Sequence, residues 1–207
     1  MSMIAEYRQL TPAQLAKLSR DPDAVEAFIE EFDADDEFQD NFDDDDDDDF
    51  EEGEGGGGDD EDEEEEEEDE YSTRDRDDDD SNGVGSMGKY YSLDKSWHAL
   101  QYLLNDDAWK GSGPLFDAVL GGTEIGEDMG YGPPRVLTPD EVRAVSVALN
   151  KLDKAALKKK FDPKAMEKAD VYVGDQDFNE LSGRLKELTV FFEEAAENGN
   201  GMLLILS

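Results

Sequence analysis

The sequence predicts an α+β fold, a single compact domain in which an early and a late strand share a small sheet and several helices pack on it. Three observations lead to this prediction. Residues 3–9 alternate between the two faces of a short strand, and residues 202–206 form a continuous apolar run typical of a strand buried on both faces. Capped amphipathic helices lie between these segments. Strands near both ends of the sequence with helices between them indicate an α+β domain in which these two strands share one sheet.

Two helix-start signals follow the first strand. Thr11 is a candidate N-cap, Pro12 occupies the first helical position, and Gln14 completes the spacing of a capping box. Asp21 and Pro22 repeat the start signal. The apolar residues beyond them recur at intervals of three and four, which places them on one helical face: Val25, Phe28, Ile29 and Phe32.

A strongly acidic segment then interrupts the domain. Residues 33–80 contain 32 Asp and Glu against two Arg, a net charge of −30 out of the −39 of the whole chain. Such a stretch cannot bury enough apolar surface to offset the entropy lost on ordering, so we expect disorder over residues 33–85. The predicted organisation is therefore 1–32 as the first part of the domain, 33–85 as a disordered acidic insertion, and 86–207 as the remainder.

Regular structure is predicted to resume directly after the insertion. Residues 89–93 (KYYSL) favour a strand, and Asp94 is the expected cap of a helix with Trp97, Leu100, Gln101 and Leu104 on one face. Residues 114–120 form a short apolar element. Residues 123–136 are rich in Gly and Pro, which predicts a long ordered loop.

The last third of the chain reads mainly as helix. Thr138, Pro139 and Glu141 form a second capping box, while Asp153 and the pair Asp162-Pro163 open two short helices. Residues 171–173 are a candidate strand. A long amphipathic helix is predicted from about 177 to 197, with Gly199 at its end, before the central strand at 202–206.

Composition excludes several classes of site. The chain has no Cys and one His, so disulfides, thiolate metal sites and multi-histidine metal sites within one chain are excluded. No apolar run approaches the length needed to span a bilayer, no signal peptide is visible, and the expected location is the cytoplasm. A net-negative body attached to the insertion would repel phosphate, so we expect no nucleic acid among the partners and no membrane.

Four blocks of sequence resemble the YfbM-like family of bacterial domains of unknown function. They are MSMIAEYRQLTP at the start, LDKSWHALQYLL at 93–104, LGGTEIGEDMGYGPPRVLTPDEV at 120–142, and FDPKAM at 161–166. The resemblance implies a compact α+β fold in a small bacterial cytoplasmic protein, and it implies no particular activity. The acidic insertion departs from the family pattern, so any role for it rests on its own residues.

The best candidate surface combines one helix with the Gly-rich loop. His98 could perform acid–base chemistry with a carboxylate of the loop, because imidazole titrates near neutrality. The structural alternative is that His98 hydrogen-bonds to the loop and Trp97 belongs to the core. Arg135 could clamp an anion or pair with Glu127 or Asp128 to hold the loop, and pairing is the favoured interpretation. The candidate ligand- or partner-binding residues are Trp97, His98, Glu124, Glu127, Asp128, Tyr131 and Arg135.

Other motifs predict no further chemistry. The loop lacks the Gly-Lys-Ser/Thr ending of a phosphate-binding loop, and no serine sits in a nucleophile elbow. Asp78, Asp80 and Asn82 begin a calcium-loop pattern, but Lys89 stands where the bidentate Glu belongs. We therefore expect no metal, no cofactor and no catalytic residue.

The favoured function is a non-enzymatic binding or regulatory protein that recognises a protein partner. The acidic insertion would assist if that partner is basic, because opposite charge accelerates association. The insertion could also serve only solubility or mimic nucleic-acid charge. The alternative function is a small-molecule binder or enzyme that uses His98 and the 121–135 loop. The pattern leaves the oligomeric state and the identity of any partner open.

Overall fold

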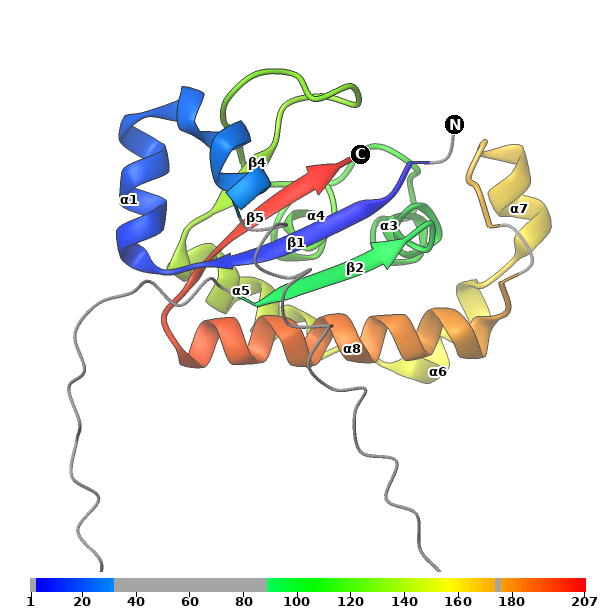
Figure 1. The fold of residues 1–207 in the computed structure, drawn as a ribbon. Coiled ribbons are helices and arrows are strands. Elements are labelled where there is room, and N and C mark those ends of the chain that lie inside the picture. The colour runs from blue at the N-terminus through cyan, green and yellow to red at the C-terminus, as the bar shows by residue number, and fades with distance from the viewer. Residues whose placement is uncertain (1–2, 32–88, 174–175) are drawn as a thin grey trace, which may run out of the picture. The chain divides into compact units, whose positions relative to one another are not determined.

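A computed structural model describes residues 3–31, 89–173 and 176–207 (Figure 1). The described residues form a five-stranded antiparallel sheet in the order β2-β1-β5-β4-β3, with helices packed on it, which confirms the predicted α+β fold. The predicted disordered insertion at 33–85, the calcium-loop pattern from Asp78 and the helical position Phe32 lie outside these residues. The strands are β1 (Ala5–Leu10), β2 (Tyr90–Asp94), β3 (Thr123–Glu124), β4 (Arg135–Leu137) and β5 (Gly201–Leu206).

The helices largely follow the predicted start signals. Thr11 and Thr138 cap their helices through complete capping boxes, each with Pro at the start of the helix. The described helices are α1 (Pro12–Arg20), the 3-10 helix η1 (Pro22–Ala24), helical residues 25–31, α3 (Trp97–Asn105), α4 (Pro114–Asp117), α5 (Pro139–Leu149), α6 (Lys154–Lys160), α7 (Pro163–Lys168) and α8 (Phe178–Glu197). None of these helices is both long and apolar enough to cross a bilayer.

β5 occupies the middle of the sheet, beside β1 (Figure 1). All six of its residues are buried, as its apolar sequence predicts. Tyr7 of β1 and Arg135 of β4 both pair with Leu204, one from each side. A strand that is flanked on both edges and covered on both faces has no solvent-facing side, which explains its lack of alternation.

The side chains of β5 contribute to two hydrophobic cores, one on each face of the sheet. Met202, Leu204 and Leu206 join a larger core built with α3, α4, α5 and α8. Leu203 and Ile205 join a smaller core built with α1, residues 25–29, Ile125 and Val136. Because successive strand residues point to opposite faces, this alternation separates the two cores by the sheet itself.

Asp94 does not cap the helix that follows it. It is the last residue of β2 and adopts a left-handed backbone with φ of 49°. The helix starts three residues later at Trp97, so Ser96 takes the N-cap position, without a side-chain cap bond. The prediction was wrong because the chain needs a turn between the strand and the helix, and Asp94 begins that turn.

Two further predictions need correction. The predicted loop at 123–136 begins and ends in paired strands, β3 and the start of β4, which are too short to show a strand period. The candidate strand at 171–173 has no regular structure. The amide of Val171 instead bonds the carbonyl of Met166, closing α7, and the amide of Tyr172 bonds His98.

Candidate functional site

The sequence predicts one candidate surface made of Trp97, His98 and the Gly-rich loop. In the structure, the sheet separates the two parts of this surface. Trp97 and His98 lie on α3, on the side of the larger core. Glu127 and Asp128 lie on the opposite side, in a hollow that they share with Pro22 and Val25 beside the smaller core. Tyr131 packs against the larger core from the far end of the loop. The structure therefore gives two separate candidate regions.

His98 is buried, with 6% of its surface exposed. Its Nδ1 accepts a hydrogen bond of 3.2 Å from the amide of Tyr172, so the neutral ring carries its proton on Nε2. Nε2 is buried and has no hydrogen-bond partner among the described residues. Burial also lowers the pKa of His98, which favours the neutral ring at pH 7. An unsatisfied N–H donor therefore lies just beneath the surface.

Two tryptophan rings pack against the imidazole of His98. Trp97 stacks on the imidazole with centroids 4.6 Å apart, is itself buried, and donates its indole N–H to the carbonyl of Met3. Trp109 lies 4.8 Å from the imidazole centroid and is 51% exposed, while Tyr172 is 55% exposed. We call His98, Trp109 and Tyr172 the His98 patch. Trp97 is buried beneath the patch and belongs to the larger core, as the structural alternative for this residue predicted.

A tight turn brings Trp109 back over α3. Asp106 ends the helix with a left-handed backbone, φ 57°, which reverses the chain. The carboxylate of Asp107 then accepts hydrogen bonds from the amides of Trp109, at 2.9 Å, and Lys110, at 2.8 Å. These two bonds lower the pKa of Asp107, so the turn is held by a carboxylate that is ionised at neutral pH. Trp109 is thus positioned rather than free at the surface.

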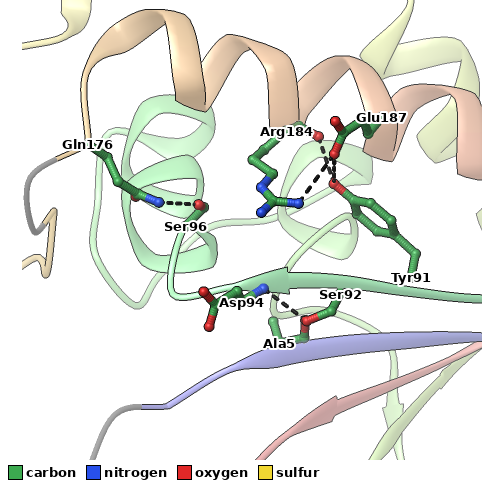
Figure 2. Close-up of polar contacts among 8 residues, drawn as sticks. All are labelled: Ala5, Tyr91, Ser92, Asp94, Ser96, Gln176, Arg184 and Glu187. Carbon is green, nitrogen blue, oxygen red and sulfur yellow. Dashed lines mark hydrogen bonds and ion pairs between the residues drawn. The ribbon is translucent and has the colours of Figure 1, made fainter.

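A polar seam fixes the start of α3 against α8. Figure 2 shows Gln176, which lies just before α8, reaching to Ser96, where its Nε2 donates a hydrogen bond of 2.6 Å to the hydroxyl. In the same view, the hydroxyl of Tyr91 donates to the Arg184 carbonyl at 3.1 Å and to the Glu187 carboxylate at 3.2 Å. Burial, followed by the charge of Glu187, raises the pKa of Tyr91. The seam joins β2, α3 and α8, and so holds His98 in place.

The Gly-rich loop is shaped by its own contacts. The Asp128 carboxylate accepts hydrogen bonds from the amides of Gly130, at 2.7 Å, and Gly132, at 3.1 Å. Gly126 has φ of 74°, and a Cβ there would lie 3.2 Å from the carbonyl oxygen of Pro22. A side chain at Gly126 would be strained by both its backbone and its neighbours. Asp128 and Gly126 therefore have structural roles in the loop.

Arg135 pairs with Glu124, at 3.8 Å, rather than with Glu127 or Asp128. The register of the two short strands explains this correction, because Glu124 stands directly opposite Arg135 in the β3–β4 pair. The partner of Arg135 is therefore a residue of β3, and the predicted pairing with a loop carboxylate was wrong. The carboxylates of Glu127 and Asp128 are left without a cation among the described residues.

These two carboxylates line a polar hollow of about 440 Å³ beside η1. We call it the acidic hollow. Asp23 and Glu26 contribute two more carboxylates, and among the described residues none of the four forms an ion pair. The complete lining is Pro22, Asp23, Val25, Glu26, Glu127, Asp128, Met129 and Pro134. The described part of the chain contains no group of three His, Asp or Glu side chains suited to a metal ion.

The geometry limits the chemistry available at His98. No carboxylate among the described residues hydrogen-bonds to its ring, so the Asp–His arrangement of acid–base catalysis is not assembled. The patch instead offers two exposed aromatic side chains beside a buried imidazole. Trp109 and Tyr172 were missed in the sequence because they follow no apolar period, although large aromatics in Gly-rich or polar segments were a usable signal.

Known proteins add a family and a fold. The chain matches the family model described as a domain of unknown function (DUF1877) over residues 1–205. Its structure is similar to that of YfbM, a protein of unknown function from Escherichia coli, with a TM-score of 0.59 and 15% sequence identity over 99% of each chain. At this identity the likeness shows the fold alone. No curated protein matches the chain. Both matches agree with the resemblance found in the sequence.

Proposed function

The chain belongs to the DUF1877 family of domains of unknown function, and we propose that it is a non-enzymatic cytoplasmic protein that binds a protein partner through the His98 patch. One observation carries this proposal. Trp109, whose ring packs on His98, and Tyr172, whose amide bonds Nδ1 of His98, are each about half exposed, at 51% and 55%. Nε2 of the same imidazole is buried and has no partner among the described residues.

This arrangement suits a protein interface. Trp and Tyr are enriched among the residues that contribute most to protein–protein binding, because they bury a large area at a small entropic cost. The Nε2 donor of His98 suits a backbone carbonyl or a side-chain oxygen of the partner. A partner that supplied this acceptor would satisfy a group whose burial otherwise costs about 1–3 kcal/mol.

Charge favours a basic partner. The acidic hollow presents four carboxylates, and residues 33–80 add a net charge of −30 in the same chain. Opposite charge mainly raises the rate of association, and its effect weakens as salt rises. The contacts made by the His98 patch would then persist at high salt. The attraction exerted by the acidic groups would weaken as the salt concentration rises.

A small-molecule binder is the second candidate, because the unpartnered Nε2 donor also suits a compact acceptor ligand. The loop carboxylates would not take part, since Glu127 and Asp128 lie across the sheet from His98. Enzymatic use of His98 has no supporting carboxylate among the described residues.

The test is a pull-down from native host lysate at low and high salt, with bound proteins identified by mass spectrometry. It compares the full chain, a Trp109→Ala/Tyr172→Ala variant, and a deletion of residues 33–80. Val147→Ala is the matched control, because Val147 is an exposed apolar residue on α5, 48% exposed, outside the patch. We expect the aromatic variant to lose the partner at both salt concentrations, and the deletion to weaken capture mainly at low salt.

Retention of the partner by the aromatic variant would refute the proposal. Loss on deletion alone would move recognition to the acidic segment. If no partner is captured, a thermal-shift screen of metabolites with wild type and His98→Gln tests the small-molecule candidate.

A further inference from the structure

An apolar cavity of about 230 Å³ lies between α3, the end of α5, α6 and α8, and none of the residues of the His98 patch lines it. Leu100 of α3, Leu157 of α6, and Leu181 and Leu185 of α8 form much of its wall. Apolar cavities of roughly 150 Å³ in other proteins stay dry and admit benzene, so this space is large enough for a small organic group. The lining favours an apolar occupant because it offers few hydrogen-bonding groups to water.

Two lysines stand at the mouth of this cavity. Lys154 of α6 and Lys186 of α8 are exposed, and neither forms an ion pair with any described residue. Unpaired lysines are notable in a chain with a formal net charge of −39. The hydroxyl of Ser182, half-buried in the wall, also makes no hydrogen bond to another described residue. The mouth therefore offers two positive charges and one hydroxyl above an apolar interior.

We propose that this cavity binds a small amphiphilic carboxylate, with its hydrocarbon tail among the leucines and its carboxylate between Lys154 and Lys186. Burial of the tail supplies most of the affinity, because apolar surface leaves water. The lysines select an anionic head over a neutral one. The cavity is too small to seat a protein surface, so this site is separate from the proposed partner-binding patch and does not depend on it.

Octanoate is the probe, with 1-octanol as the neutral analogue of equal tail length and acetate as the head without a tail. Binding to the full chain is followed by NMR shifts of backbone amides and quantified by titration. We expect saturable octanoate binding with shifts concentrated at Leu100, Leu157, Leu181 and Leu185. Acetate should produce no saturable change, and octanol should bind more weakly than octanoate.

Substitution of the lysines tests the head-group contact. Because exposed charge pairs contribute little each, Lys154→Gln with Lys186→Gln should weaken octanoate binding about fivefold and leave octanol binding unchanged. Lys158→Gln with Lys159→Gln is the matched control, because it removes two lysines of α6 that do not line the cavity. This control should change octanoate affinity less than twofold. All four lysines are exposed, so these variants should keep the fold.

Filling the cavity tests the tail contact. Ser182→Leu adds apolar volume to the wall and should weaken octanoate and octanol by the same factor. The proposal is overturned if octanoate produces no saturable shifts, or if the shifts lie outside the cavity. It is also overturned if the two double-lysine variants have equal octanoate affinity.

Discussion

The two faces of the sheet carry hydrophobic cores of different size, and we call them the deep face and the shallow face. On one face, α3, α4, α5 and α8 bury a large core against β1 and β5. On the other, α1, η1 and residues 25–31 cover a smaller core that reaches only to Ile125 and Val136. The larger core buries more apolar residues, while the smaller core leaves room for the acidic hollow beside it. A substitution should therefore cost more on the deep face than an identical one on the shallow face.

The largest effect is expected for Leu188→Ala on the deep face. Leu188 of α8 is fully buried, at 0% exposure, within the larger core. Truncating it should lower the free energy of unfolding by about 4 kcal/mol, because the surrounding helices cannot close the space that is left. Urea unfolding measures the change. A loss below about 2 kcal/mol would mean that the larger core relaxes easily, which contradicts the comparison.

The same substitution on the shallow face should cost about half as much. Leu18 of α1 is also buried, at 1% exposure, but it belongs to the smaller core beneath a nine-residue helix. We expect Leu18→Ala to lower the free energy of unfolding by about 2 kcal/mol, because this short helix can settle toward the sheet. Equal losses for Leu18→Ala and Leu188→Ala would remove the distinction between the faces.

Two capping boxes sharpen the comparison, because Thr11 begins a helix over the smaller core and Thr138 begins a helix of the larger core. Asp177 forms a third capping box, at the start of α8. Thr11 starts α1 and Thr138 starts α5, and both side chains accept a hydrogen bond from the third helical amide. Each Thr→Ala variant should cost about 1 kcal/mol, since capping is a local interaction and does not depend on core depth. Thermal unfolding of both variants checks this. A clear difference between them would show that even local contributions follow the face.

The smallest effect is expected from the protonation of His98. Its pKa is lowered by burial, so between the folded-state pKa and the unfolded value of about 6.5 the unfolded chain binds more protons. Stability should therefore be fully present above about pH 6.5 and decline as the pH falls toward the folded-state pKa. His98→Asn places an amide oxygen at the position of Nδ1, which retains an acceptor for the Tyr172 amide, and should remove this part of the pH dependence.

The measurement is the free energy of unfolding of both proteins between pH 8 and pH 5. Carboxylates contribute a slope common to both, so the difference between the two curves isolates His98. Parallel curves would show that the imidazole ring is not desolvated in the folded protein.

Local signals predicted most of the fold. An N-cap such as Thr138 bonds a residue only three positions away, so it is visible in the sequence. The continuous apolar sequence of β5 likewise predicts a buried strand. β3 and β4 escaped prediction because two or three residues cannot display a period. Asp94 misled because cap residues and turn residues share the same short polar side chains.

The site was predicted less completely. Trp97 and His98 stood out as residue types, but Tyr172 reaches His98 from 74 residues away, which no local pattern encodes. The loop carboxylates and His98 were joined in the prediction because both regions carry ionisable groups. The sheet separates them, and only the alternation of Leu203 and Leu204 between the two cores reveals this.

The pairing of β1 with β5 also affects when the chain can fold during its synthesis. Ala5 pairs with Leu206, so the central pair of the sheet joins segments that are 201 residues apart in the sequence. At about 5–20 residues per second, a ribosome needs roughly 10–40 s to pass from one to the other. During that interval β1 lacks its central neighbour, and both cores lack the strand that they share. The fold can therefore be completed only after β5 has emerged from the ribosome. Until then, the nascent chain must avoid aggregation with its cores incomplete.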